Sequence, residues 1–148
     1  MTPWGVLRLE LALVALIPGS AQAKPLPLPG IVTPSGNIRC FYVPARPCTC
    51  CCDIHRAAYS QREQNSCMAR SGLDWHGWEV YAARPTTTVC SGGILYNSNR
   101  NLPAYRRLAY GSTWRFAAFT CTSRIKGLTC TTSKGHGVFL SRQSWRGW

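Results

Sequence analysis

Cysteine is the residue type with the most evident chemistry in this chain. Nine cysteines occur among 148 residues, and four of them lie beside a histidine in one short segment, Cys48-Thr-Cys-Cys-Cys52-Asp-Ile-His55. Thiolate and imidazole groups are ligands that suit zinc or copper(I). The segment lacks both the paired Cys-x-x-Cys spacing of a zinc site and the Cys-x-x-Cys-His of haem attachment. Disulfides are therefore the favoured interpretation, and no metal or other cofactor is expected.

Carboxylates that could act in catalysis are scarce. A glycosidase needs two positioned carboxyl groups. After the first 23 residues the chain contains only Asp53, Glu63, Asp74 and Glu79. No Gly-x-Ser-x-Gly motif is present to mark a serine hydrolase. We therefore expect a protein without catalytic activity, and we assign no catalytic residue.

A small basic ribonuclease is the enzymatic alternative. Two histidines and a lysine can carry out acid–base catalysis on a phosphodiester. The candidate groups are His55, His76 and His136, with Lys126 or Lys134. Nothing in their spacing places them together, so a binding or structural role is preferred.

The chain is strongly basic, with 17 lysines and arginines against five acidic residues and a formal net charge of +12. Such a charge favours anionic partners. Residues 105–115 and 142–148 interleave arginine with aromatic residues, a pattern that can neutralise phosphates and stack on sugars or bases. The same pattern arises in strands whose aromatic residues face the core and whose arginines face water. The candidate polyanion-binding residues are Arg106, Arg107, Arg115, Arg142 and Arg146.

These observations lead to an expected partner class. We expect an extracytoplasmic binding or structural protein whose partner is an anionic cell-envelope polymer or a membrane surface. No specific nucleic acid is expected as a partner.

Residues 1–23 have the pattern of a secretory signal peptide. Arg8 supplies a positive charge, Leu11–Ile17 a short apolar run, and Ala21-Gln-Ala23 a small-x-small cleavage site. The run is shorter than the about 20 apolar residues that span a bilayer. Export together with many cysteines implies disulfides and a secreted or periplasmic location. Residues 24–32 are rich in proline and are expected to form an extended linker, followed by one secreted domain over residues 33–148.

The rest of the chain predicts short β-strands. Apolar segments separated by Gly, Pro, Asn and Ser indicate an all-β or β-rich small α+β fold, in one disulfide-stabilised antiparallel domain. Ile38–Val43 and Thr86–Cys90 have strand composition. Between them, Ala57–Met68 has room for one or two helical turns.

The segment Trp114–Arg142 predicts three antiparallel strands in a row, a meander near the end of the domain. Folding its first hairpin about Arg124–Gly127 places Cys121 opposite Cys130. Opposed residues of antiparallel strands have Cα atoms about 4.5–5.5 Å apart, which is within disulfide reach.

Several motifs follow one another in a recognisable order: Pro34-Ser-Gly-Asn-Ile-x-Cys40, Cys52-Asp-Ile54, Leu108-x-Tyr-Gly-Ser-x-Trp114, Phe119-x-Cys-Thr-Ser123, Gly127-Leu-Thr-Cys130 and Gly135-His-Gly-x-Phe-Leu-Ser-Arg142. Over about residues 33–145 the chain resembles a family of small secreted bacterial cysteine-containing proteins of unknown function. The resemblance implies export and a compact disulfide-bonded fold, and no established activity. This chain departs from the pattern at Gly93, where such proteins usually carry an aspartate.

Six cysteines match the family pattern: Cys40, Cys52, Cys67, Cys90, Cys121 and Cys130. Six cysteines allow fifteen connectivities, and sequence order suggests the pairs 40–52, 67–90 and 121–130. Cys48, Cys50 and Cys51 are additional to the pattern. Cys48 can pair with Cys50 or with Cys51, and an odd thiol can join two chains in a disulfide-linked dimer.

Overall fold

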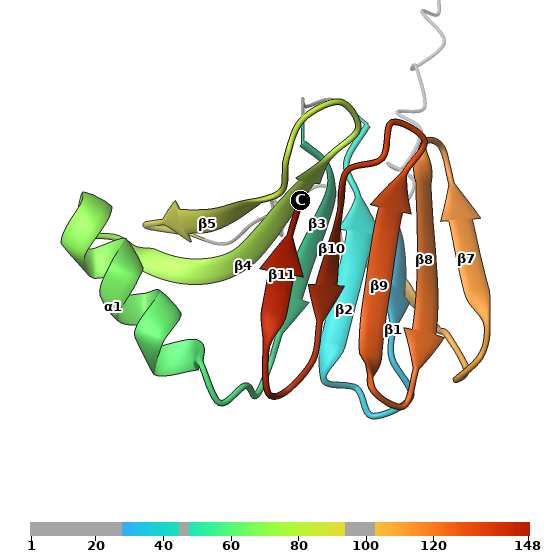
Figure 1. Ribbon diagram of the computed structural model, residues 1–148, viewed down its shortest axis with the longest axis horizontal. Helices are drawn as coiled ribbons and strands as arrows, with labels where there is room; N and C mark the ends of the chain where they lie inside the picture. The colour runs from blue at the N-terminus through green and yellow to red at the C-terminus, as the bar shows by residue number, and fades with distance from the viewer. Residues whose placement is uncertain (1–27, 45–47, 94–102) are drawn as a thin grey trace, which may run out of the picture.

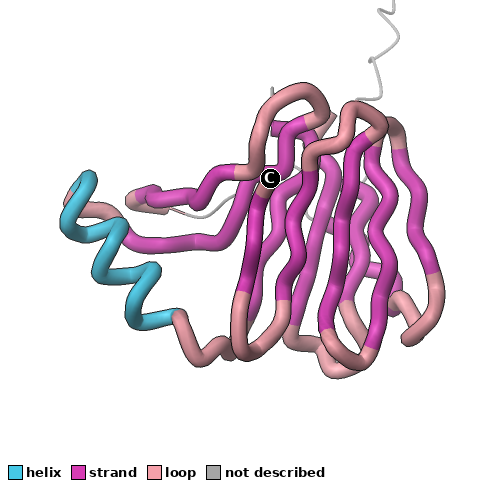
Figure 2. The backbone as a smooth tube through the Cα atoms, viewed as in Figure 1, coloured by secondary structure: helices cyan, strands magenta, loops and turns pink. Residues whose placement is uncertain are grey.

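The computed structural model describes residues 28–44, 48–93 and 103–148. Within this part of the chain, eleven strands and one helix are arranged as two sheets with the helix at one side (Figures 1 and 2). The domain is therefore β-rich, as expected. The expected signal peptide, residues 24–27 of the expected linker and the side chain of Cys48 lie outside the described residues.

The larger sheet has six strands in the order β5–β4–β3–β2–β1–β6. In chain order these are β1 (Leu28–Val32), β2 (Ile38–Tyr42), β3 (Cys48–Ile54), β4 (Asp74–Tyr81), β5 (Thr87–Ser91) and β6 (Pro103–Arg107). Neighbouring strands are antiparallel except β1 and β6, which are parallel. The last strand of this sheet in chain order, β6, therefore pairs with β1 on the side opposite β2.

Strand β1 corrects the expectation of a linker. Residues 28–32, expected to be an extended spacer, pair with β2 and β6 instead. Proline is tolerated near the beginning of a strand, where Pro29 stands, although it cannot donate a hydrogen bond. Ile31 and Val32 are β-branched and favour a strand. Ile31 is only 1% exposed, so its burial in the core holds this segment in the sheet.

The smaller sheet is an antiparallel meander in the order β11–β10–β9–β8–β7. Its strands are β7 (Thr113–Phe116), β8 (Phe119–Arg124), β9 (Gly127–Thr132), β10 (Gly137–Leu140) and β11 (Trp145–Gly147). The expected three-stranded meander therefore has five strands. A turn at Ala117, whose φ is 49°, divides the first expected strand into β7 and β8, and β11 is added at the end.

The two sheets pack face to face over β1, β2 and β3, whereas β4 and β5 extend beyond the smaller sheet (Figure 1). The helix α1 (Ser60–Ser71) lies along this extension and ends at Gly72, which adopts the left-handed conformation. Glu63 on α1 is buried and accepts a hydrogen bond from the indole Nε1 of Trp145, 3.0 Å away. This bond links the helix to β11. No helix in the described ranges is long and apolar enough to cross a membrane.

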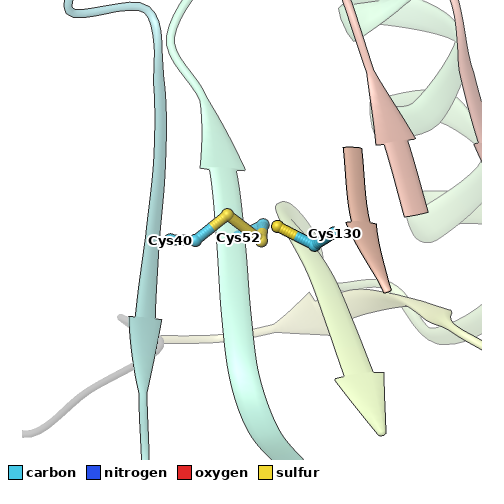
Figure 3. A group of neighbouring side chains, drawn as sticks. All are labelled: Cys40, Cys52 and Cys130. Atoms are coloured by element: carbon cyan, nitrogen blue, oxygen red, sulfur yellow. A yellow bond between two sulfur atoms is a disulfide. The ribbon is translucent and has the colours of Figure 1, made fainter. Parts of the chain in front are cut away.

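Three disulfides tie neighbouring elements together: Cys40–Cys52, Cys67–Cys90 and Cys121–Cys130. These are the pairs expected from the sequence. Two of them join directly opposed residues, one pair in each sheet, and their sulfurs meet in the core (Figure 3). The third joins α1 to β5. Disulfides of this number are typical of proteins outside the reducing cytoplasm.

Candidate anion-binding end of the sandwich

One end of the sandwich collects loops from both sheets (the lower end in Figure 1). We call this surface the loop end, and it consists of residues 33–37, 55–59, 108–112, 124–127 and 141–144. Backbone hydrogen bonds join these loops to one another and to the strands. The Ala58 N–H donates to Arg142 O over 2.7 Å, and the Gly111 N–H donates to Ser123 O over 2.7 Å. The loops therefore form one continuous surface.

Asn37 holds the first two loops together. Its side-chain Oδ1 accepts from the Arg56 N–H over 2.8 Å, and its Nδ2 donates to Arg56 O over 3.0 Å. Its backbone O accepts from the His55 N–H over 2.8 Å. Residues 55 and 56 are thus fixed by three hydrogen bonds to one asparagine, which is the last residue of the Pro-Ser-Gly-Asn turn.

A hydrogen bond between Tyr59 and Ser141 holds the loop of residues 141–144. The Tyr59 hydroxyl donates to Ser141 O over 2.9 Å, and both residues are buried. The Ser141 hydroxyl also accepts from the Ser144 N–H over 3.0 Å, which closes the turn that carries Arg142. The backbone at residue 142 is therefore fixed from both of its sides.

Between these fixed loops lies a polar depression of about 360 Å³. It is lined by Ser35, Gly36, Asn37, His55, Arg56 and Arg142. The depression continues past the two arginines over Ala58 and Gln143. No carboxylate lines either part of it. Each guanidinium carries five N–H donors in a planar fork that matches phosphate, sulfate or carboxylate oxygens, so an oxyanion is the chemical group that fits here.

The acidic side chains of the described residues are bound elsewhere. Asp53, the acidic residue nearest in sequence to Arg56, accepts a hydrogen bond from Arg39 Nε over 2.9 Å. Burial raises the pKa of Asp53, and the adjacent Arg39 guanidinium opposes that rise. Glu63 accepts from Arg62 over 2.8 Å. Neither Arg56 nor Arg142 forms an ion pair with any described residue. Their positive charge is therefore available at the surface.

The expected polyanion-binding arginines do not form one surface. Arg142 lines the depression, and Arg107 donates to Pro34 O at its edge. Arg106 and Arg115 line a separate cleft of about 460 Å³ between the outer strands β6 and β7. Arg146 lies over the Trp148 ring at 5.1 Å on β11. Arg56 was missed from the sequence, because it has no aromatic neighbour of the kind that marked the others.

Of the additional cysteines and the histidines, only His55 lies with the arginines, where it lines the depression. Cys50 and Cys51 are buried on the central strand β3, so an intermolecular disulfide through either one requires the residues that cover it to move away. The three histidines lie on separate elements: His55 after β3, His76 on β4 beside Ser91 O, and His136 between β9 and β10.

A group of three sulfurs lies in the core, from Cys40, Cys52 and Cys130, all within 4.8 Å of one another. It is the only cluster of potential metal ligands among the residues that the structure describes. Because these sulfurs are bonded in two disulfides, they supply no thiolate ligands.

Comparison with protein-family models, with curated proteins and with solved structures finds no match to this chain. The loop end is therefore interpreted from the geometry and charge of its own residues.

Replacing Tyr59 by phenylalanine should alter how the stability depends on pH. Burial raises the pKa of Tyr59 above its ordinary value of 10.0, and the negative charge of Glu63 raises it further. The unfolded chain releases this proton before the folded chain does. Its stabilising contribution is therefore complete below about pH 10 and decreases above it, by up to about 1.4 kcal/mol per pH unit.

Urea unfolding of parent and Tyr59→Phe between about pH 9 and pH 11 measures this contribution. The variant should be about 1 kcal/mol less stable at neutral pH, because the bond to Ser141 O is lost. Its stability should then fall less steeply in alkali than that of the parent. Equal slopes would contradict the assignment. Burial also raises the pKa of Tyr81, which is present in both proteins and so cancels in the comparison.

Proposed function

We propose that this protein is a non-catalytic extracytoplasmic binding module that holds an anionic group of an envelope component between Arg56 and Arg142. The observation that carries the proposal is a depression lined by two arginines and a histidine, without a carboxylate. The arginines come from loops that follow strands of different sheets, and hydrogen bonds to Asn37, Ala58 and Ser141 fix their backbones. A site ordered before binding loses little conformational entropy when it binds.

A location outside the cytoplasm is part of this proposal. The signal-peptide pattern of residues 1–23 and the three disulfides support export. Phosphate- and carboxylate-bearing polymers are abundant ligands for a basic surface in such a compartment.

The double variant Arg56→Ala/Arg142→Ala tests the proposal. Soluble polyphosphate is the probe, and binding is measured by calorimetry at physiological salt. Each exposed ion pair contributes up to about 1 kcal/mol, so the double variant should bind roughly ten-fold more weakly. Both side chains are exposed, so the fold should be unaffected.

A matched control removes the same charge at two positions that do not line the depression. The double variant Lys134→Ala/Arg146→Ala changes the net charge equally but leaves the depression intact. Polyphosphate binding close to that of the parent is expected. If both double variants weaken binding equally, the affinity reflects net charge alone and the proposed site is wrong.

The ribonuclease alternative is less well supported, because the three histidines lie on separate elements. An assay of RNA cleavage by the parent protein, with the triple variant His55→Ala/His76→Ala/His136→Ala as control, separates the two functions. Cleavage that the triple variant lacks would replace the binding proposal by an enzymatic one.

A further inference from the structure

The loop end carries two large apolar or aromatic side chains that point away from the core. Ile125, at the tip of the β8–β9 turn, is 86% exposed, and Tyr110 in the loop before β7 is 46% exposed. Ile125 is the most exposed large hydrophobic side chain in the described residues. The hydrogen bonds from Gly111 N to Ser123 O and from Ser123 N to Ser112 O place the two loops side by side.

Cationic side chains share the loop end with these two residues. Arg124 and Lys126 flank Ile125 directly and are exposed. Arg107 ends β6 just before the loop that carries Tyr110 and reaches Pro34 O in the first loop. Arg56 and Arg142, which line the depression, are further cations of the loop end. The five loops contain no aspartate or glutamate. This end of the molecule therefore combines an exposed apolar tip with several cations and no carboxylate in its loops.

The tip is held firmly in place. The β8–β9 hairpin is crosslinked by Cys121–Cys130, three residue pairs from the turn. Gly127 closes the turn against β10, where a Cβ atom would lie 2.4 Å from Leu140 O. Ile125 therefore stays outside the fold, because the adjacent backbone is held by the sheet on both sides.

A surface of this composition fits the interface of an anionic bilayer. An isoleucine transferred from water into the region between headgroups and acyl chains gains hydrophobic stabilisation. A tyrosine favours the same depth because its ring is apolar and its hydroxyl is polar. Each arginine or lysine near an anionic leaflet is attracted by its negative surface potential. A purely polymeric ligand would use the cations alone and leave Ile125 in water.

We propose that the loop end docks on an anionic membrane surface, with Ile125 and Tyr110 inserted among the headgroups and the arginines of the loop end and Lys126 on lipid phosphates. This inference rests on the proposed function, since Arg56 and Arg142 supply part of the headgroup contact. It adds the partner, a lipid bilayer, and the two side chains that enter it. The long axis of the β8–β9 hairpin would then point toward the membrane.

Sedimentation with vesicles tests this docking. Vesicles of phosphatidylcholine mixed with phosphatidylglycerol should bind the oxidised protein, and vesicles of phosphatidylcholine alone should bind it much more weakly. Ile125→Ser should weaken binding to the mixed vesicles roughly ten-fold, because the apolar contact is lost. Arg124→Ala and Lys126→Ala should each weaken it about five-fold. Met68→Ser on α1, which alters an exposed apolar side chain outside the loop end, should bind as the parent does.

Two readouts separate failure of this inference from failure of the proposed function. Ile125→Ser should bind soluble polyphosphate as the parent does, because polyphosphate has no apolar phase for the side chain to enter. If Ile125→Ser binds the mixed vesicles as tightly as the parent does, the membrane inference is wrong and the anion site stands. The same conclusion follows if the parent does not bind these vesicles but still binds polyphosphate. If Arg56→Ala/Arg142→Ala still binds polyphosphate as the parent does, the proposed anion site is wrong.

Discussion

Joint replacement of Cys121 and Cys130 by alanine is expected to lower the free energy of unfolding by about 5 kcal/mol. The crosslink closes a loop with a sequence separation of nine, and its loss alone is worth about 3 kcal/mol. Both side chains are fully buried, and the Cys130 sulfur lies within 4.8 Å of the Cys40 and Cys52 sulfurs. Removing each sulfur leaves a gap in the core that adds about 1 kcal/mol. Small domains are typically stable by about 5–15 kcal/mol, so this loss would leave the fold marginal.

Urea unfolding followed by tryptophan fluorescence measures this loss. The control is Cys67→Ala/Cys90→Ala, which removes a disulfide between α1 and β5, where Cys90 is only partly buried. This control should cost about 4 kcal/mol, of which about 3 kcal/mol comes from the crosslink and about 1 kcal/mol from the gap left at the fully buried Cys67. A smaller loss for the Cys121 and Cys130 pair than for the control would show that the core disulfide does not have the packing role described above.

Gly77→Ala is expected to destabilise the protein by at least about 3 kcal/mol. Gly77 lies at a register shift in β4, has a φ of +116°, and would place a Cβ atom 2.1 Å from Cys52 O. The atom that it meets belongs to the backbone of the adjacent central strand. Neither strand can move without breaking the ladder between β3 and β4, so strain and lost hydrogen bonds add together.

The control for this prediction is Gly135→Ala. Gly135 also has a positive φ, +87°, but no atom lies within 4 Å of the position of its Cβ. The Gly135→Ala substitution should therefore lower the free energy of unfolding only by the backbone strain, about 1–2 kcal/mol. Thermal unfolding of the two variants provides the comparison. Equal losses would mean that the close approach of Gly77 to β3 has no energetic weight of its own.

The parts of the fold that could be predicted are those set by neighbouring residues. The β8–β9 hairpin follows from a short turn and alternating side chains, and its register pairs Cys121 with Cys130 as expected. The turn at Ala117 was missed, because a positive φ is normally supplied by glycine or asparagine. The parallel pairing of β1 with β6 was also missed, because about 70 residues separate the two strands and no local pattern links them.

The candidate site shows the same limit. The sequence marks Asn37 only as part of the motif that ends at Cys40, yet its side chain bonds to Arg56, 19 positions away. Arg142 was chosen for its aromatic neighbours, but it lines the depression because Ser141 and Ala58 hold its backbone. The depression exists only after packing brings together three loops that are distant in sequence. Residue types and spacing therefore indicated that the surface is basic, and not where its charges converge.

The distribution of the cysteines divides the chain into two covalently independent halves. Cys121 and Cys130 pair with each other, and every other cysteine lies at or before Cys90. A single cleavage between Cys90 and β6 would leave two fragments, each with its own disulfides. Their association would then depend on the sandwich core and on the backbone ladder by which β6 joins β1. If these fragments separated, each would be able to reassemble with the complementary fragment of a second cleaved chain. One chain would then donate a strand to the sheet of the other.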